Sequence, residues 1–354
     1  MLHKASWARA AALWTAMLAG AACAQSAFQS PLALPAAKSE LAIRAPLNAM
    51  AMAGTRMVTA GQRGHILYSD DGKSWTQADV PLSADLTALS FPSAKQGWAV
   101  GHEGVILHTT DGGATWRRQL DGIQAAELLV KQYARPANPA DPAATRLQEE
   151  ARAFAAQGAD KPFLDVWFED EKKGFAIGAF NLILRTEDGG DSWKPWLDRI
   201  DNPRGLHLYA MRPAGGSLFI VGEQGLVLRL DRQQQRFVHV PLPYQGTLFG
   251  VLGTAGTTLV FGLRGNAFRS TDGGASWSKV ETGVSAGLSS GVVRADGSIV
   301  LVSQAGQALL STDEGATFSR VRLASVAPTF AVVESGKGTL ALAGLGGVRM
   351  EVVK

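Results

Sequence analysis

A short hairpin phrase repeats along this chain of 354 residues and predicts an all-β fold, a seven-bladed β-propeller. The phrase returns about every 40 residues, which is the period of propeller blades. Each copy consists of brief β-rich runs separated by glycine turns, as in a small antiparallel sheet. The 40 glycines exceed the roughly 7% of an average protein because each repeated turn uses several of them.

The composition excludes several other classes. Hydrophobic residues make up 46% of the chain and charged residues 18%, so the chain can bury a core and is not disordered throughout. A single cysteine cannot build a disulfide or zinc framework. The formal net charge of +3 is too small to indicate nucleic-acid binding.

The first 24 residues have the pattern of an export signal. Lys4 and Arg9 precede an apolar run over 10–22, which is too short to span a bilayer and ends in the A-x-A site Ala22-Cys23-Ala24. We predict cleavage after Ala24 and export to the periplasm or the outer face of a membrane. A lipoprotein attached through Cys23 is the alternative.

Export would change the mature chain. Losing Lys4 and Arg9 lowers the net charge from +3 to +1, and losing Cys23 leaves no cysteine. We expect no transmembrane segment after the signal. We expect residues 25–37 to be flexible and residues 38–354 to form a single propeller, as a monomer.

Seven copies of the phrase define the expected blades. A typical copy predicts four strands, over 86–91, 97–100, 105–109 and 115–119. The second and third copies are separated by one period plus about 36 residues, so an insertion lies between blades 2 and 3. The copies are anchored at Gly61, Gly101, Gly178, Gly222, Gly262, Ser303 and Gly344.

The seventh copy contains only three strands. An extended stretch, Ser39–Arg44, precedes the first blade and belongs to no copy. We expect it to become the outer strand of the last blade, so that the ring closes and no long sheet edge stays open.

A polar turn near the end of the copies matches the Asp box, S/T-x-D-x-G-x-T/S-W/F. Its carboxylate and hydroxyl can accept bonds from N–H groups of the turn, and its aromatic residue can pack into the sheet. The EF-hand spacing and its distal glutamate are missing, so we interpret the turns as structural and expect no metal. The residues are Asp71, Trp75, Asp111, Trp116, Asp188, Trp193, Asp272, Trp277, Asp313 and Phe318.

The insertion over 120–160 predicts a helical hairpin. Asp121 can cap a first helix, which Pro136 and later prolines interrupt. A second helix is expected to start with Asp141 as N-cap and Pro142 at its first position, and to stop at Gly158. The hairpin either decorates a blade or forms a lid or partner surface.

No arrangement of reactive side chains identifies an enzyme. Ser285 and Ser289 match G-x-S-x-G but lie among strands and turns rather than before a helix. The histidines form no metal motif, and we expect no cofactor. A carbohydrate-binding protein or sialidase-like glycoside hydrolase is the alternative, because Asp boxes occur in sialidases. The chain departs from sialidases in having seven expected blades and only four tyrosines.

The propeller face formed by the hairpin tips is the candidate binding face. A hand alignment of the starts of the inner strands adds Asn48, Thr87, Asp165, His207, Leu248, Ser289 and Phe330 to this face. A solvated rim without a ligand is the competing interpretation. The candidate residues for a partner or ligand are Arg63, His102, Glu103, Asp165, Asn181, Arg204, His207, Glu223 and Arg264.

The repeats resemble the photosystem II stability/assembly factor family within the BNR/Asp-box group. The resemblance rests on the phrases at 101–116 and 262–277, and on 164–168 with 174–178. It implies an exported propeller that holds membrane-protein intermediates by protein contacts, and makes Arg63, Arg204 and Arg264 the nearest matches to client-binding arginines. The insertion departs from the family pattern, so the photosynthetic client does not carry over.

Together these features predict a non-catalytic scaffold for a protein partner. We expect the partner to be an extracytoplasmic part of a membrane-protein complex or its assembly intermediate, such as a transporter, and we expect no nucleic-acid partner.

Overall fold

The computed structural model describes residues 29–135 and 141–353. The chain divides into two units, 1–30 and 31–354, and all of its described strands and helices belong to the second unit. The predicted export signal, its cleavage site and Cys23 lie outside the described residues. None of the helices in the described ranges is long and apolar enough to cross a bilayer.

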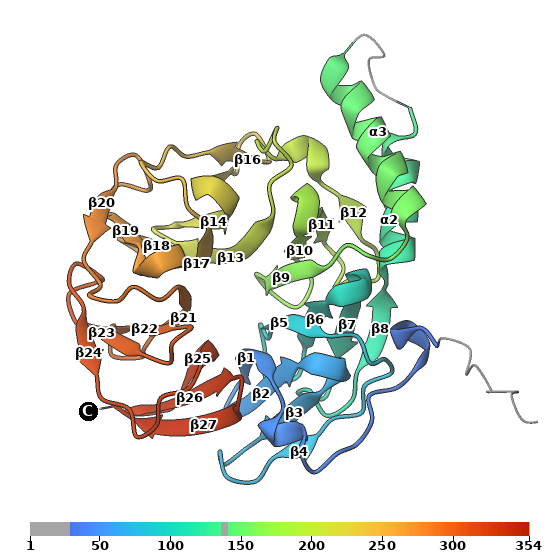
Figure 1. The fold of residues 1–354 in the computed structure, drawn as a ribbon. Helices are drawn as coiled ribbons and strands as arrows, with labels where there is room; N and C mark the ends of the chain where they lie inside the picture. The colour runs from blue at the N-terminus through green and yellow to red at the C-terminus, as the bar shows by residue number, and fades with distance from the viewer. Residues whose placement is uncertain (1–28, 136–140, 354) are drawn as a thin grey trace, which may run out of the picture. The chain divides into compact units, whose positions relative to one another are not determined.

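The described strands form seven antiparallel sheets, six with four strands and one with three (Figure 1). The first sheet contains β1 (Leu47–Ala53), β2 (Arg56–Gly61), β3 (Ile66–Ser69) and β4 (Thr76–Gln77), and the second β5 (Leu86–Ser90), β6 (Gly97–Gly101), β7 (Ile106–Thr109) and β8 (Arg117–Leu120). The third contains β9 (Phe163–Phe168), β10 (Gly174–Gly178), β11 (Ile183–Thr186) and β12 (Lys194–Pro195), and the fourth β13 (Leu208–Ala214), β14 (Ser217–Gly222), β15 (Val227–Asp231) and β16 (Arg236–His239).

The remaining three sheets continue the pattern. The fifth contains β17 (Leu248–Leu252), β18 (Thr258–Gly262), β19 (Ala267–Ser270) and β20 (Ser278–Val280), and the sixth β21 (Leu288–Val293), β22 (Ile299–Ser303), β23 (Ala308–Ser311) and β24 (Ser319–Val321). The seventh contains β25 (Thr329–Gly336), β26 (Thr339–Gly344) and β27 (Gly347–Val352). The first strand of each sheet contacts the first strands of both neighbouring sheets, and β25 contacts β1, so these strands form a closed ring. The predicted all-β propeller architecture is therefore present.

The core lies between neighbouring sheets. The second strands are almost entirely buried, and large residues such as Trp98, Phe219 and Phe261 have essentially no exposed surface. Between the second and third sheets, the Trp98 ring stacks on Phe168 with ring centroids 3.6 Å apart. Burying each such side chain contributes about 1.5–3 kcal/mol, so the ring is held mainly by this inter-sheet packing.

The polar turns are closed by their own side chains. In the turn after β7, the Asp111 carboxylate accepts hydrogen bonds from the N–H groups of Ala114 and Thr115, each at 3.0 Å. The Thr109 hydroxyl accepts from the Gly113 N–H at 3.0 Å. Gly113 has φ 90°, a conformation that favours glycine. The turns after β3, β11, β19 and β23 repeat these bonds.

The ring does not close in the expected way. Residues 39–44 form a turn and a short 3-10 helix, η2 (Ala42–Arg44), and no described strand forms a fourth strand of the seventh sheet. The prediction of an outer strand at Ser39–Arg44 is wrong, because β1 begins at Leu47 on the inside of the ring. The chain from Arg44 to Leu47 can reach about 10 Å. The outer strand of a four-stranded sheet lies about 14 Å from the innermost one, so a strand ending at Arg44 on the outside could not connect to β1 on the inside.

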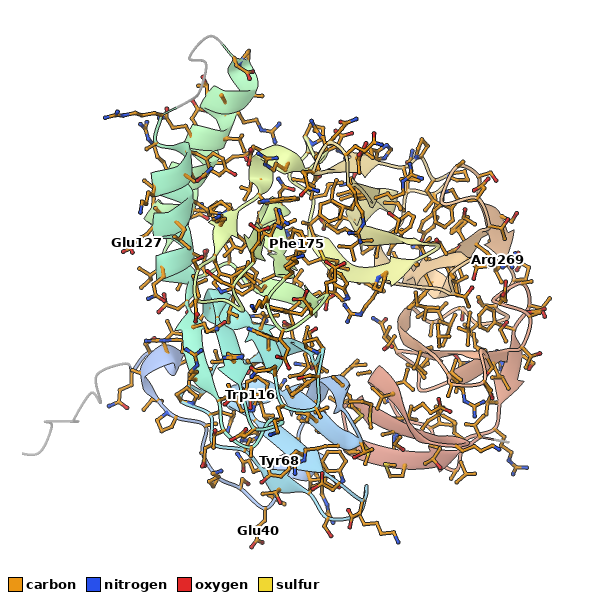
Figure 2. The ribbon with its side chains drawn as sticks, turned by 180° about the vertical axis from the view of Figure 1, so that it is seen from behind. Glu40, Tyr68, Trp116, Glu127, Phe175 and Arg269 are labelled. Atoms are coloured by element: carbon orange, nitrogen blue, oxygen red, sulfur yellow. The ribbon has the colours of Figure 1, made fainter. Side chains whose placement is uncertain are left out.

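Side chains close the ring instead. Ala42, Leu47 and Met50 pack in one buried cluster with Ala331 and Ala343 of the seventh sheet. Figure 2, seen from behind, places Glu40 at the outer rim beside the first sheet.

Part of the segment 25–37, for which we expect flexibility, lies within the described residues. The 3-10 helix η1 (Pro31–Ala33) is followed by Ala36, which is buried and donates its N–H to the carbonyl of Val80 at 3.1 Å. The Ser83 N–H donates to the carbonyl of Pro31 at 2.9 Å. From Pro31 onward, this stretch therefore packs against the loop that leads into the second sheet.

Two helices occupy the insertion, α2 (Gly122–Tyr133) and α3 (Pro142–Gln157). The Asp121 side chain accepts from two N–H groups of the first turn of α2, and Asp141 caps α3. The buried Tyr133 hydroxyl donates to Asp198 Oδ1 at 2.8 Å and ties α2 to the third sheet. Figure 2 shows Glu127 on the outer side of α2, pointing away from the sheets, and Phe175 within the third sheet.

Candidate functional site

Each inner strand carries a β-bulge at the same place. On β1, Leu47 pairs with Gly61 and Ala49 with Ala60, so Asn48 is left without a cross-strand partner. The same shift occurs near the start of β5, β9, β13, β17, β21 and β25. A bulge redirects the side chain of the extra residue. We call the seven extra residues the bulge ring: Asn48, Thr87, Leu164, Tyr209, Phe249, Ser289 and Phe330.

The bulge ring surrounds a central cavity. All seven residues are half-buried, and all line a cavity of about 410 Å³. Three of our hand-aligned positions are therefore shifted: Asp165 should be Leu164, His207 should be Tyr209, and Leu248 should be Phe249. The three positions were displaced by one or two residues, because the register of an inner strand is set by its pairing with the second strand rather than by the residue types at its start.

The polar members of the bulge ring bond to the next sheet. Asn48 Nδ2 donates to the carbonyl of Leu86 at 2.9 Å. The Thr87 hydroxyl donates to the carbonyl of Phe163 at 2.8 Å, and the Ser289 hydroxyl to that of Thr329 at 2.6 Å. These side chains already have partners in the scaffold, so they hold neighbouring sheets together.

Three of the four apolar and aromatic members, Leu164, Tyr209 and Phe249, lie on the third, fourth and fifth sheets, and Phe330 lies on the seventh. Tyr209 and Phe249 meet edge to face with ring centroids 5.7 Å apart. The His207 ring, just before β13, has its centroid 6.3 Å from that of Tyr209 and 4.6 Å from that of Phe180. We call Phe180, His207, Tyr209 and Phe249 the aromatic row. It runs from a hairpin tip to the central cavity.

The outer end of the aromatic row is exposed at Phe180, and beside it lies Lys161, which is paired with Asp160 at 2.7 Å. Phe180 is 50% exposed and has φ 53°, which fixes it at the tip of the turn η5 (Ala179–Asn181). Lys161 Nζ lies 5.1 Å from the Phe180 ring centroid and 5.7 Å from that of Phe154 on α3. A cation over two aromatic faces is held by their quadrupoles, so the insertion contributes directly to this end of the row.

Glu223 lies beside the aromatic row. Its carboxylate accepts from the His207 N–H at 2.8 Å, and His207 Nδ1 lies 3.8 Å from it. Burial, with the Glu223 charge as a lesser cause, raises the pKa of Tyr209 above its usual value. The Tyr209 hydroxyl is therefore neutral and able to donate a hydrogen bond at physiological pH. Arg204 hydrogen bonds to Gln224 in the neighbouring tip.

Asp165 and Asn181 have structural roles. The buried Asp165 carboxylate accepts from the Met211 N–H at 2.7 Å and pairs with Arg212 at 2.5 Å. Asn181 is 5% exposed, and its Oδ1 accepts from Asn202 Nδ2 at 2.9 Å. Scaffold partners thus occupy Asp165 Oδ2 and Asn181 Oδ1, and Asp165 also lines the central cavity.

The remaining candidates are dispersed over several hairpin tips. Arg63, Glu103 and Arg264 are tip residues with φ 56–58°, in the turns η3 (Gln62–Gly64), η4 (His102–Gly104) and η8 (Leu263–Gly265). His102 is exposed on the second sheet. Left-handed backbone at a fixed position presents each side chain outward. Because these tips belong to the first, second and fifth sheets, they make no single cluster with the aromatic row.

The described residues provide no metal centre. Across 29–135 and 141–353, no three histidine, cysteine or acidic side chains lie together as metal ligands would. His207 of the aromatic row was among the predicted candidate residues, whereas Tyr209 and Phe249 were not. The row's signal in the sequence is a pair of aromatic residues, His207 and Tyr209, at the start of an inner strand.

A family model described as "Photosynthesis system II assembly factor YCF48" matches residues 50–132 and 152–321. These ranges cover more than two thirds of the chain, and the gap between them falls within the helical insertion. The resemblance inferred from the repeats is therefore confirmed.

Curated relatives match over shorter stretches. The Photosystem II assembly lipoprotein Ycf48 of Synechococcus sp. (strain CC9902) is 29% identical over 118 residues, which is 32% of this chain and 35% of the relative. The Photosystem II stability/assembly factor HCF136 of Arabidopsis thaliana is 30% identical over 86 residues, 24% of this chain and 21% of the relative. The chain thus spans about a third or less of the length of these relatives.

Solved structures share the fold. A structure titled "YCF48 bound to D1 peptide" has a TM-score of 0.62 at 17% identity, covering 88% of this chain and 94% of its own. YCF48 from Cyanidioschyzon merolae has a TM-score of 0.63 at 16% identity, covering 88% and 96%. Streptogramin B lyase has a TM-score of 0.66 at 12% identity, covering 88% and 95%. At these identities the likeness concerns the fold alone.

Proposed function

The chain belongs to the family of the photosynthesis system II assembly factor YCF48, and on that premise we propose that it is a non-catalytic scaffold for membrane-protein assembly. In this proposal each of the seven sheets is one blade and the polar turns are Asp boxes. The scaffold holds an extended extracytoplasmic segment of a membrane-protein complex during its assembly.

The observation that carries the proposal is the aromatic row, which leads from the tip of the third sheet to the central cavity. Tyr209 and Phe249 at the cavity, together with Leu164, give an apolar wall without scaffold hydrogen bonds at their side-chain ends. Phe180, exposed at the outer end, has Lys161 beside it. Such a row suits a peptide with aromatic or aliphatic side chains.

The comparisons support a peptide as the ligand. One structure with the same fold is titled as bound to a D1 peptide, and the curated relatives are named as photosystem II assembly factors. The identity of the client does not transfer from them, because the alignments cover a small share of those proteins. We propose a membrane-protein client of another kind, such as a transporter, where the host has no photosystem.

Catalysis is not part of the proposal. The fold leaves the activity open, since a lyase and an assembly factor both match it. Asp165, the carboxylate nearest to the role of a glycosidase acid, is paired with Arg212 and the Met211 N–H inside the scaffold. No observation in the described residues favours glycoside hydrolysis.

We further propose that the chain acts outside the cytoplasm. Export through cleavage after Ala24 is the main proposal. The name of the Synechococcus relative includes the word lipoprotein, which supports attachment through Cys23 as the second route.

The test is capture of the client by the purified protein. Immobilised protein is incubated with detergent-solubilised membranes of the host, and bound proteins are identified by mass spectrometry. We expect one defined membrane-protein complex, with recovery reduced at least ten-fold by Phe180→Ala combined with Tyr209→Ala. Leu34→Ala removes an exposed apolar side chain far along the chain from the aromatic row, and it should leave recovery unchanged.

Two outcomes would reject the proposal. One is the capture of no specific protein by the wild-type chain. The other is equal recovery by the double variant and by Leu34→Ala, which would show that the aromatic row does not bind the client.

A further inference from the structure

Within the part of the chain that the structure describes, the outer edge of the seventh sheet pairs with no strand, and only the start of β27 is covered, by η2. β27 pairs with β26, and no other described strand pairs with it. In the other six sheets the third strand pairs with an outer fourth strand. An unprotected edge of this length is a template for another strand, and proteins normally cover or charge such edges.

The register identifies the backbone groups at this edge. The Val353 N–H donates to the carbonyl of Gly338 at 2.8 Å, so Val353 faces β26. Because antiparallel residues alternate in direction, Val348, Met350 and Val352 turn their N–H and C=O groups away from β26. These groups have no hydrogen-bond partner among the described residues.

Exposed apolar side chains gather around the same edge. Nine large apolar side chains are exposed within 29–135 and 141–353. Two of them, Met350 and Val352, are on β27, and Leu345 is in the turn that leads into it. Val326 lies in the loop that bonds to Arg349 and Glu351, and Leu41 precedes η2, which contacts β27. A concentration of exposed apolar surface marks an interaction site.

We propose that β27 pairs with β27 of a second copy of this chain, antiparallel, about a two-fold axis through Met350. The two seventh sheets then form one continuous sheet across the dimer. Met350 lies opposite its own equivalent, and Val348 lies opposite Val352 of the other copy. All the outward N–H and C=O groups of these three residues obtain partners.

Charge selects this register over its neighbours. With Met350 on the axis, Arg349 lies opposite Glu351 of the second copy in both halves of the interface. Within its own copy Glu351 is buried and accepts from the Ala324 N–H, and Arg349 donates to the Ser325 and Ala327 carbonyls, so the opposite charges add to bonds that both side chains already make. A shift of two residues in one direction places Arg349 opposite Arg349, and a shift in the other places Glu351 opposite Glu351. Like charges directly opposite each other destabilise a strand pair, whereas opposite charges stabilise it. The segment Val348–Val352 is thus self-complementary in one register.

The proposed interface is small. It consists of one strand pair and the apolar side chains that flank it, so we expect a reversible dimer of modest affinity rather than an obligate one. This departs from the monomer expected from the sequence. The proposed dimer does not involve the aromatic row, so its test is independent of the test of the proposed function.

A cysteine on the axis tests the geometry. Met350→Cys places two thiols on residues whose Cα atoms are about 5.5 Å apart in such a pair, within disulfide range. Val352→Cys is the matched control on the same exposed edge, since its two copies would be about 13 Å apart. Both are made with Cys23→Ser. Under mild oxidation we expect a disulfide-linked dimer from Met350→Cys and at least ten-fold less from Val352→Cys.

Sedimentation velocity over a wide range of concentration tests the equilibrium. We expect a monomer–dimer equilibrium for the wild-type chain. Val352→Lys should shift the midpoint at least ten-fold toward higher concentration with an unchanged melting temperature, because a charge at the edge opposes pairing. A monomer at every concentration would overturn the proposal. Equal cross-linking by the two cysteine variants, or cross-linking of Met350→Cys only to another protein in host extracts, would also overturn it.

Discussion

Replacing Asp165 by alanine separates a structural from a catalytic role of this carboxylate. Asp165 is 3% exposed and Met211, whose N–H it accepts, is fully buried. The variant leaves that N–H without a partner, which costs about 1–3 kcal/mol. The Arg212 side chain is 40% exposed, so water can solvate its charge and the lost ion pair adds only about 0–1 kcal/mol.

The expected loss of stability is therefore about 2–3 kcal/mol. For a domain of more than 250 residues, each kcal/mol lowers the melting temperature by about 2 °C, so we expect a decrease of about 4–6 °C. Thermal unfolding followed by tryptophan fluorescence and by far-UV circular dichroism measures it. Glu171→Ala is the control, because Glu171 is exposed and its removal should change the free energy of unfolding by less than about 0.5 kcal/mol.

A second measurement on the same variant addresses catalysis. A panel of fluorogenic glycosides is tested with the wild-type chain and with Asp165→Ala. We expect no turnover by either protein. Turnover by the wild-type chain that disappears in Asp165→Ala, while the melting temperature stays unchanged, would refute the structural role and restore the glycosidase alternative.

Three further outcomes are expected. The Ser276 hydroxyl and N–H lower the pKa of Asp272 to about 2, so its contribution to stability is present above pH 4 and is lost as the pH falls toward 2; Asp272→Asn should flatten the pH dependence of the melting temperature in that window. Tyr133→Phe removes the hydrogen bond to Asp198, which costs about 1.5–3 kcal/mol, and limited proteolysis should cut the insertion sooner than in the wild-type chain. If the export signal is cleaved after Ala24, intact-mass measurement of the secreted protein gives a chain starting at Gln25; a diacylated N-terminal Cys23 would identify a lipoprotein instead.

Local chemistry explains which parts of the fold could be predicted. Asp121 and Asp141 cap their helices because a carboxylate before an amphipathic run has the same role in any context. The repeated turn places glycine and aspartate where the backbone requires them. These signals depend on neighbouring residues, and a single sequence contains all of them.

The failures concern relations between distant segments. Whether Ser39–Arg44 joins the last sheet depends on where β1 lies in the ring, and the distance from Arg44 to Leu47 decides against it. The hand alignment missed Leu164, Tyr209 and Phe249 by one or two residues, because the register of an inner strand depends on its pairing with the second strand, which lies further along the chain.

The bulge ring also shows how a repeat acquires a site. All seven inner strands present one extra residue to the central cavity. The backbone therefore supplies seven equivalent positions, and the residue type at each can differ. Where the residue is Asn48, Thr87 or Ser289, the side chain bonds to the next sheet and strengthens the ring. Where the residue is Tyr209 or Phe249, its aromatic ring packs against the other one instead. The break in the repeat, rather than the repeat itself, locates the proposed binding surface, and the insertion that interrupts the period contacts the outer end of that surface through Lys161 and Phe154.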